Sequence, residues 1–237
     1  MTEAMDSTAR PKPARQHYLI LMVSLILLLA LQPVLDEGLV GNLCMLALFT
    51  ATAVGGVYAA TGSRRFLMAA VVLACASVLT SWLTLFVQSR VLLIADHATH
   101  IVFCTYLAVV ILIHVCTVPT VTRDIVKGAI CAYLLFGITW AVLYSLIEHA
   151  QPGSFAMPAL SEEPLREFFL TSGEFTPYLY YSFVTLTTMG YGDITPVSDA
   201  ARMLSVLEGI LGSIYLAVVI AGLVGLRVSR AVAAGKT

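Results

Sequence analysis

Charged residues are scarce in this chain, and their scarcity argues against a soluble protein. Of 237 residues, 13 are Lys or Arg and 14 are Asp or Glu, together 11%, whereas a soluble domain carries about 25%. Hydrophobic residues make up 59% of the chain, and the mean hydropathy is +0.91. This composition indicates an integral, multi-pass membrane protein whose surroundings are the lipid bilayer. The net charge of −1 gives no reason to expect a nucleic-acid partner.

The sequence also lacks the motifs of metal, redox and catalytic sites. No HExxH, GxSxG or P-loop lysine occurs. The cysteines form no CxxC pair and all lie within apolar runs, which favours packed small residues over a metal or redox site. They are Cys44, Cys75, Cys104, Cys116 and Cys131. We therefore expect no enzyme, no cofactor and no small-molecule substrate.

Long apolar runs are what the chain has in abundance. A helix needs about 20 apolar residues to cross the hydrocarbon. Six runs qualify: 18–35, 39–60, 66–88, 95–118, 126–148 and 200–226. A seventh, 175–188, is too short to cross. The pattern predicts an all-α membrane protein with six transmembrane helices and a re-entrant segment between the last two.

The basic residues predict the orientation, because cytoplasmic loops carry an excess of Lys and Arg. With a cytoplasmic N-terminus, ten of the 13 basic residues lie inside and only Arg90, Arg166 and Arg202 lie outside. We expect both termini in the cytoplasm and the connector 149–173 on the outer side. A bacterial inner or plasma membrane is the expected location.

The stretch "TLTTMGYGDITP", residues 185–196, is polar and rich in glycine although it lies between apolar runs. Backbone groups without partners cannot face lipid, so this stretch must be buried or must line a watery path. Thr176 and Pro177 predict an N-cap and a first helical residue for a short helix before it. Gly190 and Gly192 allow positive φ angles. The carboxyl end of that helix, with about −0.5 of a charge, is suited to a cation.

Within this stretch, "TTMGYGD" resembles the potassium-channel signature TVGYG. The order of outer helix, acidic turret, short helix, signature and glycine-bearing inner helix is also similar to that family. Clear resemblance covers about residues 175–225, and the outer helix, 126–148, matches in position rather than in sequence. The resemblance is to the bacterial type with a single pore loop per chain. It implies a homotetramer, because one motif supplies one quarter of a closed ring.

The resemblance implies a role for each residue of the filter, residues 188–193. Backbone carbonyls of four residues would bind K⁺ as the permeant ion: Thr188, Met189, Gly190 and Tyr191. Gly192 and Asp193 would lie at the outer mouth. Tyr180, Tyr181, Thr187, Asp193 and Glu208 would support the filter, with Tyr191 packed against the two tyrosines. Met189 replaces the usual valine, and Val184 replaces a glutamate that pairs with the aspartate in some bacterial channels.

The inner helix carries two glycines and one acidic residue at membrane depth. Gly212 and Gly209 fit either a gating hinge or close helix packing. Glu208 is expected to contact Thr185 or Thr187 on the short helix, or to be protonated, since a carboxylate at membrane depth is costly. Two interpretations of Glu208 remain open. It is a filter brace or proton sensor, or it is an acid whose hydrogen bonds have only a structural role.

These elements predict a division of the chain into a tail, a four-helix part and a pore part. The tail is 1–16, and 17–118 is a four-helix membrane domain that resembles a voltage sensor without its arginines. The pore domain, 119–237, comprises outer helix 126–148, turret 149–173, pore helix 175–187, filter 188–193 and inner helix 199–227.

The fourth span, 95–118, contains no Arg or Lys, so little voltage dependence is expected. Asp96 and His100, four residues apart, share a helix face there. They fit either a pH or metal response or ordinary interface residues.

Together these features predict passive, potassium-selective conduction. A weakly selective cation channel is the nearest alternative, although such channels usually lack the full GYG. A secondary transporter would show broken helices in both halves, and only one half has a break here. Comparing potassium with sodium permeability in liposomes separates these functions.

Overall fold

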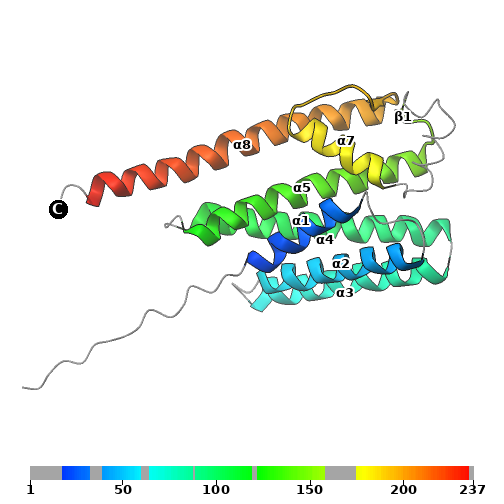
Figure 1. Cartoon of the computed structure of the whole chain (residues 1–237), viewed down its shortest axis with the longest axis horizontal. Coiled ribbons are helices and arrows are strands. Elements are labelled where there is room, and N and C mark those ends of the chain that lie inside the picture. Colours follow the sequence, from blue (N-terminus) through cyan, green and yellow to red (C-terminus); the bar gives the residue numbers. More distant parts are fainter. Residues whose placement is uncertain are drawn as a thin grey trace, which may run out of the picture.

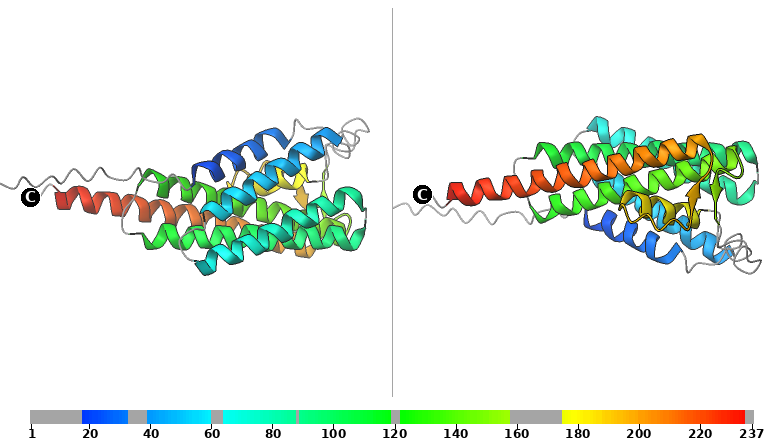
Figure 2. Two further views of the ribbon diagram at one scale, coloured as in Figure 1. Left: turned by 90° about the horizontal axis from the view of Figure 1, so that it is seen from below. Right: turned by 90° about the horizontal axis from the view of Figure 1, so that it is seen from above.

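Most of the described residues form helices that lie side by side in one elongated bundle (Figures 1 and 2). The computed structural model describes residues 18–32, 39–59, 64–87, 89–118, 122–157 and 175–234. The predicted tail, 1–16, and most of the predicted turret lie outside the described residues. The helices are α1 (Leu19–Leu31), α2 (Leu39–Ala59), α3 (Arg64–Phe86), α4 (Arg90–Thr117), α5 (Arg123–Ala150), α7 (Thr176–Leu186) and α8 (Asp199–Ala234).

Four of these helices are long and apolar enough to cross a membrane: α3, α4, α5 and the part of α8 from Asp199 to Val219. The helical membrane architecture predicted from the sequence is thereby confirmed. Within the described residues, α1 and the stretch Leu43–Tyr58 of α2 are apolar but shorter. The prediction of six spans therefore stays a prediction for these two helices.

Helices α4 and α8 extend well beyond their apolar runs, and α5 (Arg123–Ala150) extends slightly beyond 126–148. Helix α4 begins at Arg90 rather than at residue 95, after Ser89 in extended backbone. Helix α8 continues to Ala234 rather than ending at residue 227. Helix geometry does not stop where the hydrocarbon stops, because backbone hydrogen bonds are satisfied within the helix in either medium. A hydropathy window finds only the part of a helix that is apolar.

The outer surface of the bundle carries large apolar side chains. On α3, Met68, Val72 and Leu79 are each about 60% exposed or more, and Phe86 is 78% exposed. Monomeric soluble proteins rarely expose such contiguous apolar surface. These side chains are therefore suited to contact lipid tails.

Helix α5 is the centre of the bundle and contacts α1, α4, α7 and α8. Its Leu135 and Ile138 are buried against α1 and α4. The helix begins at a capped residue, since Thr122 Oγ1 accepts a hydrogen bond from the Ile125 amide at 3.3 Å and Asp124 complements the helix dipole. Because α5 contacts both the first helices and α7, it positions the pore region relative to the rest of the chain.

Helix α4 buries a polar pair rather than a row of cations. The His100 Nδ1 lies 3.5 Å from Asp96 Oδ1, and Ser81 on α3 donates to the same carboxylate oxygen at 2.9 Å. No group of three or more His, Cys, Asp or Glu suited to a metal occurs among the described residues. Arg90, the first residue of α4, donates to the carbonyl of His149 at 3.3 Å. Residues 91–117 contain no Lys or Arg.

Helix α7 covers only part of the length of the bundle and begins near the end of α5 (Figure 1). Its 11 residues span about 16 Å, too little to cross a bilayer. A two-stranded antiparallel sheet ties the chain that follows it to the end of α5. Strand β1 (Phe155–Ala156) pairs with β2 (Thr195–Pro196), and the Val197 amide donates to the Ser154 carbonyl at 2.7 Å. The residues between α7 and β2 are thus held at both ends.

Candidate functional site

Helix α7 begins one residue earlier than the Thr-Pro pattern predicts. Its N-cap is Phe175, Thr176 is the first helical residue and Pro177 the second. The N-cap role predicted for Thr176 is wrong. Proline is tolerated in this first turn because the first amides of a helix have no partner within the helix.

The carboxyl end of α7 closes in a Schellman motif, which turns the chain into residues 188–193, the predicted filter. The Met189 amide donates to the Val184 carbonyl at 3.0 Å, and the Thr188 amide donates to the Thr185 carbonyl at 3.0 Å. This motif requires a left-handed residue one position after the C-cap Thr187, and that residue is Thr188 with φ of 60°. Left-handed backbone costs a non-glycine residue about 1–2 kcal/mol.

The filter backbone is left-handed at every second residue. The φ angles are 60° at Thr188, 58° at Gly190 and 79° at Gly192. Thr188 is the only non-glycine residue with positive φ in the described part of the chain. The two glycines take this conformation at little cost because they have no Cβ. The prediction that these glycines supply positive φ is correct.

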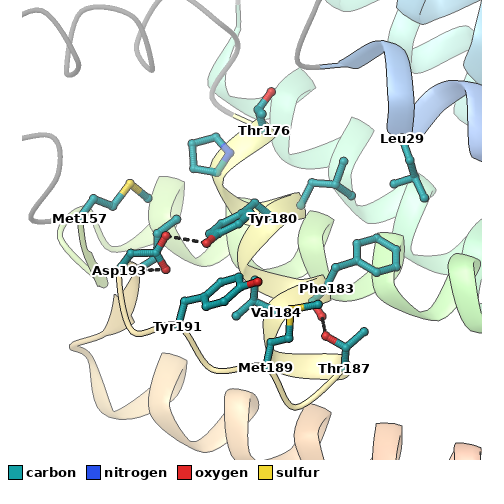
Figure 3. Close-up of a pocket in the computed structure, with 13 residues that line it drawn as sticks. Leu29, Met157, Thr176, Tyr180, Phe183, Val184, Thr187, Met189, Tyr191 and Asp193 are labelled. Atoms are coloured by element: carbon teal, nitrogen blue, oxygen red, sulfur yellow. Dashed lines mark hydrogen bonds between the residues drawn. The ribbon is translucent and has the colours of Figure 1, made fainter.

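The filter side chains lie in an apolar groove beside α7. Met189 and Tyr191 are 57% and 67% exposed. Figure 3 shows them on the same side as Tyr180 and Val184, with Leu29 of α1 at the far wall. The groove has a volume of about 730 Å³. Met189 also occupies the position where a Schellman motif places its apolar contact to the last helical turn.

Asp193 at the end of the filter has a partner that sequence reasoning missed. The Tyr180 hydroxyl donates to Asp193 Oδ2 at 2.6 Å (Figure 3), and the Ile194 amide donates to Oδ1 at 3.1 Å. Tyr180 lies on α7, outside the four membrane-spanning helices. Its hydrogen bond to Asp193, followed by partial burial, raises the pKa of Tyr180 to about 12. The hydroxyl therefore keeps its proton at physiological pH, and Tyr180 provides the contact that Val184 cannot.

The other two predicted support residues differ in direction: Tyr181 is directed to α8, whereas Thr187, the C-cap of α7, lines the groove beside Met189 (Figure 3). The Tyr181 hydroxyl lies 2.6 Å from Ser205 Oγ on α8, and its ring contacts those of Tyr144 and Phe155 at 5.1 and 5.2 Å. Thr187 donates to the carbonyl of Phe183, four residues earlier, at 2.6 Å. Their support of the filter stays a prediction.

Glu208 is buried among three helices, with no exposed surface. Its carboxyl oxygens lie 2.6 Å from Ser182 Oγ on α7 and 2.6 Å from the Tyr144 hydroxyl on α5. The predicted contact with the back of the short helix is correct, but the residues named for it, Thr185 and Thr187, are not. Ser182 lies one turn before Thr185 on the same helix face. Nothing in the sequence pointed to Tyr144.

Helix α8 runs through Gly209 and Gly212 without a break. A Cβ at Gly212 would lie 2.7 Å from Leu186 Cδ1 and 2.8 Å from the Leu186 carbonyl oxygen, whereas one at Gly209 would meet no atom within 4 Å. Gly212 therefore allows α8 to touch the last residue of α7. A gating hinge at either glycine stays a prediction, since it concerns motion.

One comparison with known proteins matches this same part of the chain. A family model described as "Ion channel" matches residues 128–226. Residues 128–226 are therefore similar to an ion-channel domain. The matched region contains most of α5, all of α7, the predicted filter and α8 as far as Leu226. Helices α1 to α4 lie before it.

The chain also has a curated relative. Over 93 residues the chain is 32% identical to two pore potassium channel c of Oryza sativa subsp. japonica. The aligned part is 39% of this chain and 17% of the length of the relative. No solved structure matches the chain. The resemblance to potassium channels predicted from the signature is confirmed by these two matches.

Proposed function

We propose that this chain is the pore-forming subunit of a potassium-selective channel, and that four copies surround one passive conduction path. The observation that carries this function is the left-handed backbone at every second residue of "TMGYG". In an ordinary strand, successive carbonyls point to opposite sides. Reversing the hand at alternate residues turns them toward a common side, where their oxygens replace the water around K⁺.

The carboxyl end of α7 favours a cation at the base of this strand by electrostatic attraction. The carboxyl end of a helix carries about −0.5 of a charge. The motif that closes α7 leads directly from its last carbonyls into the filter. An ion that has lost part of its hydration would therefore meet both the filter oxygens and the negative end of the helix dipole.

The groove beside α7 supports assembly from identical copies. Met189 and Tyr191 are mostly exposed in one chain, although they flank the backbone that must be held most rigidly. One filter strand supplies one quarter of a ring, so a closed path requires three further copies. A neighbouring copy seated in the groove would cover these two side chains and fix the diameter of the ring.

The arrangement in the membrane follows from the helices and the basic residues. The described start of α1 and the end of α8 lie toward the same end of the bundle (Figure 1). This agrees with two cytoplasmic termini and an outer segment between α5 and α7, with α1 and α2 completing six spans. Because residues 91–117 of α4 lack Lys and Arg, opening is expected to depend little on voltage.

The full chain reconstituted in liposomes is expected to carry potassium in preference to sodium. We expect a preference of at least about tenfold, which requires a difference of only ~1.4 kcal/mol between the two ions. The measurement compares the decay of outward potassium and sodium gradients, with a protonophore and a pH-sensitive dye reporting charge flow. Protein-free liposomes are the control, and clamped diffusion potentials test the weak voltage dependence.

Three results would contradict this function in different ways. Equal potassium and sodium rates would indicate a weakly selective cation channel. A flux that requires a second solute would indicate a transporter. A protein that crosslinks and sediments only as a single subunit would leave the filter strand without its ring.

Replacing Tyr180 by phenylalanine is expected to shorten sustained potassium flux without changing the initial ion preference. The substitution removes the 2.6 Å hydrogen bond to Asp193 but leaves the ring in the groove. A hydrogen bond of this kind contributes about 1 kcal/mol, which corresponds to a roughly fivefold lower population of the intact filter per subunit. The measurement is the flux time course under a maintained gradient.

The matched control for this substitution is the neighbouring tyrosine on the same helix. The Tyr181 hydroxyl contacts Ser205 instead of the filter, so Tyr181→Phe is expected to lower the melting temperature without shortening the flux. If both variants shorten the flux equally, the Tyr180–Asp193 contact has no special role in the filter.

A further inference from the structure

Three buried polar side chains meet behind the filter, each from a different helix. Tyr144 of α5, Ser182 of α7 and Glu208 of α8 have no exposed surface. Ser182 Oγ lies 2.6 Å from Glu208 Oε1 and 2.8 Å from the carbonyl oxygen of Gly137 on α5. The Tyr144 hydroxyl lies 2.6 Å from Glu208 Oε2. These contacts link α7 to both helices that it packs against.

The number of protons needed by these contacts can be counted. Three short oxygen–oxygen contacts require three hydrogens, and two hydroxyls supply only two. The Gly137 carbonyl can only accept, and it takes the Ser182 proton in the arrangement that gives each of the three contacts its own hydrogen. The contact between Ser182 and Glu208 Oε1 then lacks a hydrogen unless Glu208 provides one. The Tyr144 proton is already directed to the other carboxyl oxygen.

Within the described part of the chain, no cationic group that would favour a negative charge by attraction acts on Glu208. The titratable groups that act on it are phenols: Tyr144 and Tyr133 from α5, and Tyr181 from α7. The one ion-pair contact among the described residues joins Asp96 to His100 on α4, and it does not involve Glu208. An ionised carboxylate without a cation is costly in such an interior.

We propose that Glu208 is a neutral carboxylic acid that donates its proton to Ser182 and thereby fastens α7 to α5 and α8. Oε1 carries the proton, and Oε2 accepts from Tyr144. Glu208 is then a positioning residue for the filter, and this part of the inference rests on the proposed channel function. Loss of the proton would leave two oxygens in short contact without a hydrogen and would loosen α7.

Glutamine is the matched test of a neutral acid, because its amide also has one donating and one accepting end. We expect Glu208→Gln to keep potassium flux and the melting temperature close to wild type, with flux within about threefold. Glu208→Ala removes both contacts and is expected to lower flux by about tenfold or more. If Glu208→Gln behaves like Glu208→Ala, a neutral side chain does not fulfil the role and the proposal is wrong.

Infrared spectroscopy tests the proton itself and does not depend on conduction. The purified full chain at neutral pH is expected to show a protonated-carboxyl C=O band that is absent from Glu208→Gln. Glu148→Gln is the control carboxylate, since Glu148 accepts hydrogen bonds from the amides of Gly153 and Phe155. This variant should leave the protonated-carboxyl band of the wild-type chain in place.

Tyr144→Phe is a second variant that identifies the band even if Glu208→Gln does not fold. It removes the donor to Oε2, so the C=O band is expected to shift to higher wavenumber. A wild-type chain with no protonated-carboxyl band, or a band that Tyr144→Phe leaves in place, would overturn the neutral acid. A channel that fails to conduct potassium but shows the band would count only against the proposed function.

Discussion

Gly212→Ala is expected to separate α8 from the end of α7 and to abolish most potassium flux. The added methyl group would lie 2.7 Å from Leu186 Cδ1 and 2.8 Å from the Leu186 carbonyl oxygen. A side-chain end can move, but the carbonyl belongs to the last residue of α7, whose side chain is fully buried. Overpacking of this kind costs about 1–3 kcal/mol for each subunit. Flux in liposomes and the melting temperature in detergent measure the effect.

The matched control is Gly209→Ala, one turn earlier on the same helix. No atom of the described chain lies within 4 Å of a Cβ at that position, and alanine favours the helix over glycine by about 0.5–1 kcal/mol. We therefore expect unchanged or slightly higher stability. Adding Leu186→Ala to Gly212→Ala should rescue little, because the contact with the carbonyl remains. If Gly212→Ala leaves the melting temperature unchanged and alters only channel opening, the glycine is a hinge and not a packing site.

The location of the functional segment was predictable from the sequence because lipid leaves few options for non-helical backbone. Residues 185–196 are polar and glycine-rich between apolar runs, and unpaired backbone cannot face hydrocarbon. The short helix before it and the long helix after it followed from the lengths of the apolar runs. The positive φ angles of Gly190 and Gly192 followed from glycine chemistry.

The left-handed Thr188 was not predicted, because residue preferences argue against it. Threonine is branched at Cβ and disfavours positive φ. The geometry of the helix end overrides this preference, since the amides of residues 188–190 close back onto the carbonyls of Val184 and Thr185. The available signal was positional: a helix that ends shortly before Gly190 commonly has a left-handed residue one position after its C-cap.

Partners that come from distant segments could not be read from the sequence. Tyr144 is 64 residues from Glu208, and Ser182 is 26 residues from it. Sequence reasoning placed Glu208 behind the short helix by its depth in α8, but the rotation of each helix decides which side chains meet. Tyr180 was named as filter support, yet its hydrogen bond to Asp193 depends on where the filter strand turns.

Gly190→Ala is expected to eliminate potassium flux while leaving the helices folded. Gly190 has φ of 58°, and left-handed backbone costs an alanine about 1–2 kcal/mol. Four copies in one ring would multiply this cost. A Cβ at Gly190 would meet no atom within 4 Å in one chain, so the effect comes from the backbone and not from a clash with the chain itself. Liposome flux is measured together with helical circular dichroism and melting.

The handedness of the substituted residue separates backbone strain from bulk. D-alanine at position 190, introduced by semisynthesis, prefers positive φ and is expected to restore flux. Gly153→Ala is the matched control, because Gly153 also has positive φ, at 85°, but lies in the turn after α5. We expect it to reduce stability slightly and to conserve conduction. Flux that persists in Gly190→Ala, or flux that is lost equally with L-alanine and D-alanine, would show that conduction does not require left-handed backbone at Gly190.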